Sequence, residues 1–170
     1  GELDAAVNID LGKKERKATL TPLTFIRLGT SGALQADLPV DSLLASSHGL
    51  GLDGLLHYYQ GSAHFTEHPL ITAFIAETDW NTYFPRPYLV AGSAELLQKA
   101  SAFQQGITAT ACGFYGPQGR VLRLGIQEPE LNEKLTAFHF EDLRITNFEM
   151  ETSAIYGLSA LMGHRALSVN

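Results

Sequence analysis

Residues 88–112 read YLVAGSAELLQKASAFQQGITATAC, and this stretch decides the class of fold. Apolar and β-branched residues gather at its two ends, which favours strands over 88–91 and 107–112. Between them, apolar residues recur at the spacing of one helix face, which predicts a helix over 94–105 that ends at Gly106. A strand, a helix and a second strand in this order are typical of α/β folds.

The same alternation continues on both sides of this stretch. Further strands are expected over 23–28, 40–46 and 166–169, and further helices over 2–7, 131–140 and 149–162. Residues 49–77 show no clear periodicity, and residues 79–87 read as a loop. We therefore expect an α/β fold with a mixed, partly parallel central sheet flanked by helices. Because the last strand is apolar and no covering helix follows it, we expect a single domain over 1–170 that is truncated at both ends.

The composition excludes several classes of protein. Among the 170 residues, 12 are Lys or Arg and 18 are Asp or Glu, so the net charge of −6 argues against a nucleic-acid-binding face. The single cysteine, Cys112, excludes an internal disulfide. No apolar run is long enough for a membrane-spanning helix, and the first ten residues lack the features of a signal peptide. We expect a cytoplasmic protein with neither nucleic acid nor membrane as a partner.

The first segment whose residues could bind a ligand is RLGTSG, residues 27–32, at the end of an expected strand. In open α/β sheets, ligands bind beyond the carboxyl ends of the strands. Arg27 supplies a planar charged fork, and Thr30, Ser31 and the amides of a turn that ends at Gly32 supply neutral donors for an oxyanion. The alternative is a tight turn that follows an exposed arginine.

The second segment is FYGPQGR, residues 114–120, in a loop rich in glycine and proline. Gln118 offers both an acceptor and donors, and Arg120 only donates. Together they suit the amide–imide edge of a planar ring, on which Phe114 can stack. The alternative is an ordinary loop of turn-forming residues.

The third segment is NFEME, residues 147–151, where Glu149 and Glu151 flank Met150 at a junction of strand and helix. A carboxylate is a good bidentate acceptor for two sugar hydroxyls. Carboxylates at the start of a helix also complement its dipole and cap it, so both interpretations stay open here.

Other residue clusters favour structural roles. Cys112 is expected to be a small buried residue, since nothing in the sequence marks it as a nucleophile. Four histidines between 48 and 68 are spaced too loosely to predict a metal site. The aromatic pair Trp80 and Tyr83 is interpreted as core or interface packing.

The three segments, in this order and spacing, resemble nucleoside phosphorylases of the uridine phosphorylase type. RLGTSG looks like their R-[IL]-G-T-x-G turn for phosphate and ribose, FYGPQGR like their F-Y-x-x-Q-x-R uracil loop, and NFEMET like their N-[YF]-E-M-E-[ST] ribose motif. The terminal SVN, residues 168–170, looks like the start of the segment on their last strand. This resemblance implies the three-layer αβα fold of that family and phosphate-dependent cleavage of uridine to uracil and ribose 1-phosphate.

The resemblance also implies a role for each residue. Arg27 and Thr30 would contact phosphate, with Ser31 and Gly32 in the same substrate-binding turn. Phe114 would pack on the base, while Gln118 and Arg120 hold its edge and Arg120 stabilises the departing base. The ribose pocket would be lined by Glu149, Met150 and Glu151. The implied catalytic residues are thus Arg27, Thr30 and Arg120, with inorganic phosphate as co-substrate and no cofactor or metal.

Family members are longer than this chain, with further phosphate ligands before it and a closing loop and helix after it, and they assemble as dimers or hexamers. The resemblance therefore implies a homo-oligomer. Two other hypotheses stay open: a non-catalytic module of the same fold that binds nucleosides or mediates oligomerisation, and a related nucleoside hydrolase. Hydrolytic members carry an acidic residue near the base where this chain has Gln118 and Arg120.

Overall fold

The computed structural model describes all residues from Gly1 to Asn170. A mixed sheet of eight strands forms its centre, in the order β3-β10-β5-β7-β9-β4, with β6 paired to β5 and β8 paired to β9. The strands span β3 Thr24–Leu28, β4 Gly32–Ala33, β5 Leu44–Gly51, β6 Tyr88–Ala91, β7 Gln104–Thr110, β8 His139–Phe140, β9 Leu143–Glu149 and β10 Arg165–Val169. The expected fold class, α/β with a mixed, partly parallel sheet, is confirmed.

Strand directions divide the sheet into two parallel groups. Strands β5, β7 and β9 run parallel to one another, and β3 runs parallel to β10. The two groups meet in antiparallel sense where Val169 pairs with Ala45. The carboxyl ends of β3 and β10 therefore lie beside the beginning of β5, which brings Arg27 toward the middle of the sheet.

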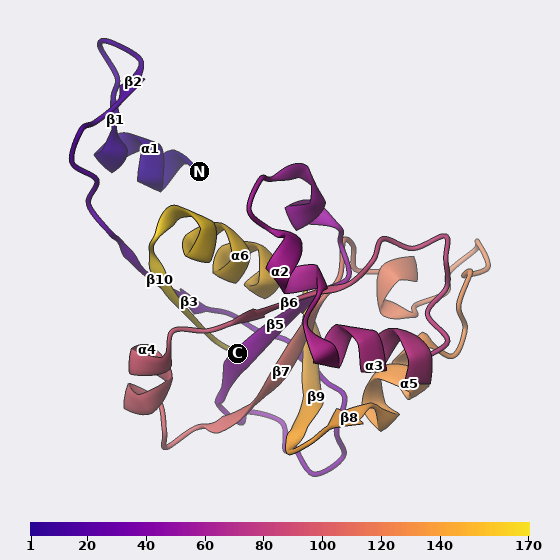
Figure 1. Cartoon of the computed structure of the whole chain (residues 1–170). Coiled ribbons are helices and arrows are strands. Elements are labelled where there is room, and N and C mark those ends of the chain that lie inside the picture. Colours follow the sequence, from indigo (N-terminus) through magenta and orange to yellow (C-terminus); the bar gives the residue numbers. More distant parts are fainter.

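Helices cover both faces of this sheet (Figure 1). They span α2 Ala63–Thr66, α3 Pro69–Glu77, α4 Ala94–Lys99, α5 Leu131–Ala137 and α6 Thr152–Met162, with short 3-10 turns η1 Leu55–Tyr58 and η2 Gly116–Gln118. The largest core cluster lies under α3 and α5, where Phe74 and Leu135 are fully buried against Ile107 and Ile145 of the sheet. Two smaller clusters lie under α6 and α4.

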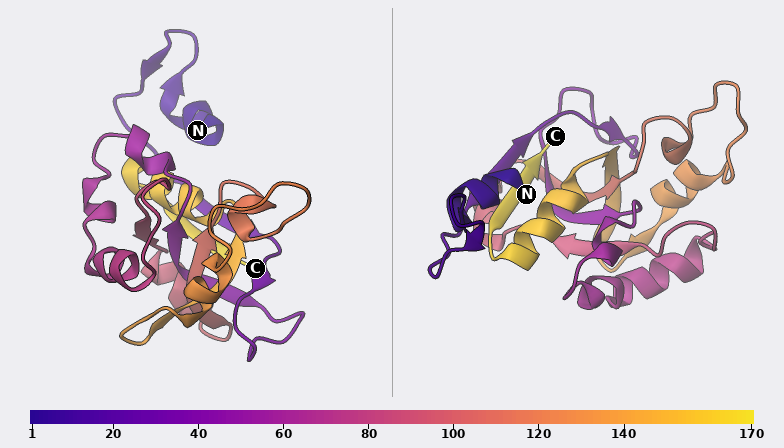
Figure 2. Two further views of the ribbon diagram at one scale, coloured as in Figure 1. Left: turned by 90° about the vertical axis from the view of Figure 1, so that its right-hand side faces the viewer. Right: turned by 90° about the horizontal axis from the view of Figure 1, so that it is seen from above.

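The N-terminal segment stands away from this body. Helix α1 Glu2–Asn8 and the hairpin of β1 Ile9–Asp10 and β2 Glu15–Arg16 project at one end of the molecule, and the loop around residues 113–130 projects at the other (Figure 2). The helix is tied to the body by His164, whose Nε2 lies 3.0 Å from Oδ1 of Asp4. The longest helix, α6, has 11 residues, and none is long and apolar enough to cross a membrane.

Three expected boundaries are wrong. The strand expected over 40–46 begins only at Leu44 and continues to Gly51, because residues 38–42 turn, with Asp41 at a φ of 67°. The helix expected to run to Gly106 ends at Lys99, and Gly106 lies inside β7, where a Cβ would collide with Thr146. The helix expected over 149–162 begins at Thr152, because Glu149 is the last residue of β9.

Other expected elements are confirmed with small shifts. Strand β6 has the predicted bounds, while β3 and β10 differ from the prediction by one residue at one end. The helix expected over 131–140 ends at Ala137, because the chain continues into the β8–β9 hairpin. Within the stretch that showed no periodicity, α3 begins at Pro69, a residue whose fixed φ suits the first position of a helix.

Candidate active site

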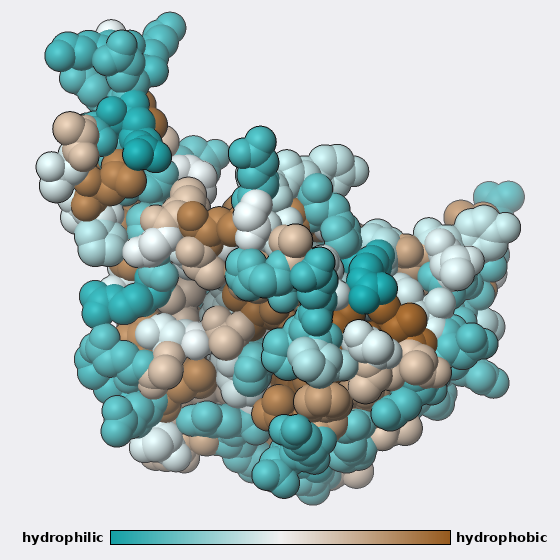
Figure 3. Space-filling model, viewed as in Figure 1, coloured by the Kyte–Doolittle hydropathy of each residue, from teal (hydrophilic) through white to brown (hydrophobic).

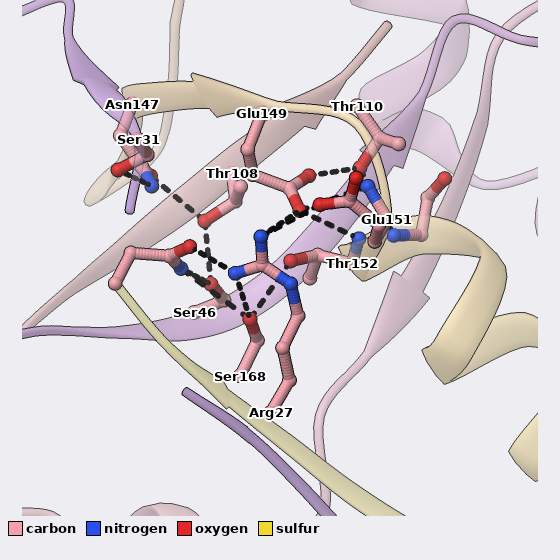
Figure 4. A network of polar contacts seen from close by, with 12 residues as sticks. Arg27, Ser31, Ser46, Thr108, Thr110, Asn147, Glu149, Glu151, Thr152 and Ser168 are labelled. Atoms are coloured by element: carbon pink, nitrogen blue, oxygen red, sulfur yellow. Dashed lines mark hydrogen bonds and ion pairs between the residues drawn. The ribbon is translucent and has the colours of Figure 1, made fainter. Parts of the chain in front are cut away.

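Arg27, at the end of β3, is the centre of a group of charged residues drawn from distant parts of the sequence. Its Nη2 donates to Oε2 of Glu151 at 2.6 Å and lies 3.5 Å from Oε2 of Glu149. Its Nη1 donates to Oδ1 of Asn170 at 2.6 Å and to Oγ of Ser168 at 3.4 Å. Only 15% of the Arg27 side chain is exposed. One guanidinium thus bridges two expected sugar-binding carboxylates and the end of β10 (Figure 4).

Glu149 is buried and fixes the beginning of α6. Its Oε2 accepts the backbone N–H groups of Glu151 and Thr152, both at 2.9 Å, and its Oε1 accepts the hydroxyl of Thr110 at 2.7 Å. The first N–H groups of a helix have no partner within the helix, and a carboxylate that accepts them stabilises this end. The sequence left open whether this carboxylate caps the helix or binds a sugar. The contacts that Glu149 makes here are those of a cap.

Thr110 completes this helix start from β7. Its Oγ1 accepts the N–H of Ser153 at 3.0 Å while its own hydroxyl hydrogen points to Glu149. The N–H groups of residues 151, 152 and 153 are therefore all satisfied within the protein. These three N–H groups are therefore not available to an anion, which would depend chiefly on Arg27 and the 29–32 turn.

The turn after β3 lies next to the same group. Oγ of Ser31 accepts Nδ2 of Asn147 at 2.9 Å, and Gly32 pairs with Phe148 of β9. Thr30 is exposed between them. The pairing of β4 with β9 holds this turn beside the Glu149–Glu151 segment, and the Thr30 hydroxyl stays open to solvent.

The loop over residues 114–120, called the base loop below, forms a second cluster of contacts. Gln118, in η2, is buried, and its Nε2 donates to the carbonyl of Glu149 at 3.4 Å. Arg120 donates through Nη1 to Oε1 of Gln118 and, at 2.7 Å, to the carbonyl of Phe114. The Arg120 guanidinium carbon lies 3.9 Å from the centre of the Phe114 ring, a cation–π arrangement. In this conformation Arg120 covers one face of the Phe114 ring.

The structure thus brings most of the predicted residues together. Arg27, Glu149 and Glu151 are in contact, Ser31 and Gly32 border them through β9, and Gln118 connects the base loop to Glu149. Met150 is exposed on the turn between the two glutamates, and Thr30 is exposed on its own turn. A buried arginine, two carboxylates and a donor–acceptor pair that suits a planar ring therefore form one connected group.

Comparisons with known proteins show the family to which the chain belongs. The sequence model of the phosphorylase superfamily matches residues 6–170. The chain belongs to this superfamily. It is 29% identical over 158 residues to uridine phosphorylase from Thermococcus kodakarensis, and 27% identical over 161 residues to uridine phosphorylase from Haemophilus influenzae. Each match covers 89% of this chain but 48% and 54% of the relative, so the chain spans about half the length of these relatives.

The fold of this chain is also similar to that of a protein of known structure. Trypanosoma brucei nucleoside phosphorylase, described as showing uridine phosphorylase activity, superimposes with a TM-score of 0.80. The match covers 99% of this chain and 63% of that protein, at 23% sequence identity. At this identity the likeness shows the fold, and it confirms the expected nucleoside phosphorylase architecture.

The sequence did not predict a cluster of hydrogen-bonded polar side chains beside Arg27, formed by Ser46, Thr108, Asn147 and Asn170 and called the polar floor below. Oγ1 of Thr108 donates to Oδ1 of Asn147 at 2.7 Å, and Oγ of Ser46 contacts Thr108. Nδ2 of Asn170 donates to Ser46 at 3.1 Å, and this connects the floor to Arg27 (Figure 4). A signal was present in the sequence, since polar side chains recur at every second position in 108/110, 147/149 and 168/170.

A second missed group lies behind the start of α6. The Tyr88 hydroxyl donates to Oδ1 of Asp53 at 2.8 Å and lies 2.9 Å from Oγ of Ser153. Burial raises the pKa of Tyr88 well above its usual value, so this phenol stays protonated and donates. Tyr156 of α6 donates to the carbonyl of Ser46 at 2.7 Å, and burial raises its pKa to about 12. Tyr156 thus donates from α6 to β5, while Tyr88 donates to Asp53 and contacts Ser153 at the start of α6.

The remaining expectations divide. Cys112 is exposed, so the expectation that it is buried is wrong: it follows β7, where the chain turns outward into the base loop. Trp80 packs against Phe74 of the core with ring centres 5.3 Å apart, as expected, whereas Tyr83 is exposed. The structure contains no group of three or more His, Cys, Asp or Glu residues that could hold a metal ion.

Proposed function

We propose that this chain contributes the nucleoside and phosphate sites of a uridine phosphorylase, which cleaves uridine with phosphate to uracil and ribose 1-phosphate. One observation carries the proposal: Arg27 contacts both Glu149 and Glu151, and the backbone of Glu149 contacts Gln118. This grouping supports the assignment of Arg27 to the anion, of Glu149 and Glu151 to the sugar, and of Gln118 to the base. The similarity to uridine phosphorylases supports the same substrate class.

In this proposal, phosphate lies between Arg27 and the 29–32 turn, with Thr30, Ser31 and the amide of Gly32 as neutral donors. One phosphate oxygen attacks the anomeric carbon of the ribose and forms the new C–O bond. The glycosidic C–N bond breaks, and its electron pair leaves with uracil, which then takes a proton. Arg27 holds the phosphate nucleophile in place, so its contribution is chiefly proximity and orientation.

The base loop stabilises the leaving group. Negative charge develops on uracil as the glycosidic bond weakens, and the guanidinium of Arg120 with the amide of Gln118 would stabilise that charge electrostatically. Arg120 covers one face of Phe114 in this structure, so the base would stack on the other face or displace the guanidinium. Glu151 would accept the ribose hydroxyls, with Met150 along the sugar and Glu149 fixing the turn between them.

We further propose that no cofactor and no metal take part, with inorganic phosphate as co-substrate. Since the relatives are about twice as long as the matched region, the phosphate site would be completed by residues outside this chain or from a neighbouring subunit. A homo-oligomer, dimer or hexamer, and a cytoplasmic location belong to the same proposal.

A non-catalytic nucleoside-binding or oligomerisation module is the second candidate. It is favoured by the complete pairing of Arg27 with protein groups, which leaves the recognised anion site self-satisfied. A nucleoside hydrolase is less well supported, because Gln118 and Arg120 stand where an acidic residue would serve hydrolysis.

The test is release of uracil from uridine by the purified 170-residue chain, with and without phosphate, and with inosine as the control substrate. The phosphorylase proposal predicts release from uridine that depends on phosphate, with little release from inosine. Release without phosphate would instead indicate a hydrolase. A folded chain that binds uridine in calorimetry but releases no base would favour the binding module.

A further inference from the structure

A cavity of about 600 Å³ lies beside the base loop, and it is lined by neither Arg27 nor Glu149 nor Glu151. It is an open cavity bordered by the 79–87 loop, the end of β7 and the segment that leads to α5, and its lining residues Leu122 and Leu124 are largely exposed. Of the residues assigned to substrate above, only Arg120 lines it. Its volume is in the range of small-molecule sites. Figure 3 shows hydrophobic atoms at the surface where the projecting loop meets the body.

The walls of this cavity are aromatic and apolar. Trp80, Phe84 and Tyr115 line it, with Leu52 and Leu131 among the aliphatic residues. The Trp80 indole N–H donates to the carbonyl of Pro85 at 3.0 Å, and its ring lies against Phe84 with centres 5.4 Å apart. The indole is therefore held in place with its one donor satisfied, and it offers the cavity a ring for stacking.

The charge at the cavity is positive. Arg120 and Arg123 both line it, and the one acidic residue there, Glu128, lies 3.3 Å from Nζ of Lys134. The carboxylate is thus offset by its own partner, which leaves Arg123 to face a ligand, together with Arg120 where the ligand competes with its contacts to Gln118 and Phe114. Arginine pairs well with carboxylates and sulfonate-like anions and also stacks on rings.

From these walls and charges we infer that the cavity is a binding site for a small aromatic anion, a planar ring system that carries a carboxylate or sulfonate. The rings lie along Trp80 and Tyr115, and the anionic group lies toward Arg123 and Arg120. Because Arg120 also donates to Gln118, an anion in the cavity competes with Gln118 for this guanidinium. Occupancy therefore weakens recognition of the base; this second step rests on the proposed function.

The chain carries its own reporter for this site. Trp80 is its one tryptophan, so intrinsic tryptophan emission reports on the cavity wall alone. The probe is 8-anilinonaphthalene-1-sulfonate, compared with N-phenyl-1-naphthylamine, which has the same rings and no sulfonate. We expect saturable binding of the sulfonate, with its emission rising as Trp80 emission falls by energy transfer. Weaker binding of the sulfonate than of the amine would overturn the inference that the site selects anions.

Two variants locate the site, each with a matched control on the projecting hairpin. Arg123→Glu is expected to weaken the sulfonate about three- to tenfold and to leave the amine unchanged. Leu124→Asp, at a side chain that is 81% exposed and can change without unfolding the core, is expected to weaken both probes. Arg16→Glu and Leu11→Asp repeat the two changes far from the cavity, where both residues are exposed. Equal effects in the controls would overturn the assignment.

Cys112 gives an independent test. It is the one cysteine, it is exposed and it lines the cavity. Alkylation by a bulky maleimide is expected to abolish probe binding in the native chain, and bound probe is expected to slow that alkylation. Cys112→Ala should bind the probe normally after the same treatment. Labelling that leaves probe binding intact would contradict the site, whether or not the chain cleaves uridine.

Discussion

Nη2 of Arg27 lies 2.6 Å from Oε2 of Glu151, a residue 124 positions further along the chain. The same arginine is expected to bind phosphate, and the same carboxylate is expected to bind the ribose. Without ligands, each residue therefore satisfies the charge of the other. Phosphate that binds Arg27 must replace Glu151, and this frees the carboxylate for sugar hydroxyls.

This exchange predicts that phosphate tightens the binding of uridine. We expect the Kd of uridine to fall about five- to tenfold at saturating phosphate, the lower part of the usual range of coupling between two sites. In Glu151→Gln the ion pair is lost, so the Kd should no longer respond to phosphate. Calorimetric titration of uridine with and without phosphate measures both.

Glu95→Gln is the control for that experiment. Glu95 also pairs with an arginine, Arg165, at 2.9 Å, but at the surface near α4. This variant should retain the full response to phosphate. An unchanged response in Glu151→Gln would show that the coupling passes through other residues.

Arg27 itself can be tested by Arg27→Lys. Lysine keeps the charge but cannot make two directed contacts from one planar group, and here one terminal nitrogen binds Glu151 while the other binds Asn170. We expect kcat/KM for phosphate to fall about 100-fold, the cost of removing one electrostatic contact in other active sites. Steady-state kinetics against phosphate concentration check this value.

Arg165→Lys, on the neighbouring parallel strand, is the matched control. Arg165 makes an exposed ion pair with Glu95, and such pairs contribute about 0–1 kcal/mol to stability. Its kinetics should equal those of the unchanged chain. If both variants lost activity equally, the loss would reflect the sheet and not the anion site.

Thr110 is predicted to position Glu149 and the start of α6. Thr110→Val removes the donor to Glu149 and leaves the N–H of Ser153 without a partner, at a cost of about 2–3 kcal/mol of unfolding free energy. Displacement of the turn should raise the KM for uridine about tenfold or more, with little change in the KM for phosphate. Urea unfolding and steady-state kinetics measure the two effects.

The conservative variant and a distant threonine separate positioning from simple destabilisation. Thr110→Ser keeps the hydroxyl and should restore most of the uridine KM. Thr78→Val removes another buried hydroxyl, one that donates to the carbonyl of Phe74, and should lower stability without changing either KM. A raised uridine KM in Thr78→Val would argue against a specific role of Thr110.

Local sequence patterns predicted β3, β6 and β10 well, because an apolar strand bounded by glycine or proline leaves few alternatives. They failed where tertiary contacts decide. Ala100 and Phe103 continue the helical spacing of apolar residues beyond Lys99, and both pack in the cluster that contains Leu167. The chain nonetheless turns there, and the close approach of Thr146 to Gly106 belongs to a strand pairing that no local pattern encodes.

The polar floor escaped prediction for a related reason. The register between β7 and β9 shifts so that Ile107 faces Ile145 while Thr108 faces Asn147, which leaves Thr146 as an extra residue. Such a bulge changes the face to which the following side chains point. It lets Ile145 enter the core while Asn147 and Glu149 face Arg27. Motifs identify Arg27 and Glu149, but the position of a bulge depends on the neighbouring strand.

His48, on β5, predicts how the free energy of unfolding depends on pH. Burial lowers the pKa of His48 below its usual value, and the nearby His68 lowers it further. As the pH falls through about 6.5, His48 therefore becomes protonated in the unfolded chain while it is still neutral in the folded chain. The contribution of His48 is fully present above this pH and is lost as the pH falls toward the pKa of the folded state. We expect the free energy of unfolding to decrease as the pH is lowered through 6.

Urea unfolding at several pH values between 5 and 8 measures this decrease, and His48→Gln should make the profile flatter. The carboxyl groups act in a different window: hydrogen bonds from Asn8 and from Arg144 lower the pKa values of Asp4 and Asp37, so the stability they provide is lost only at more acidic pH. His139→Gln, at an exposed histidine, should leave the slope unchanged. An equally steep profile in His48→Gln would assign the titration to another group.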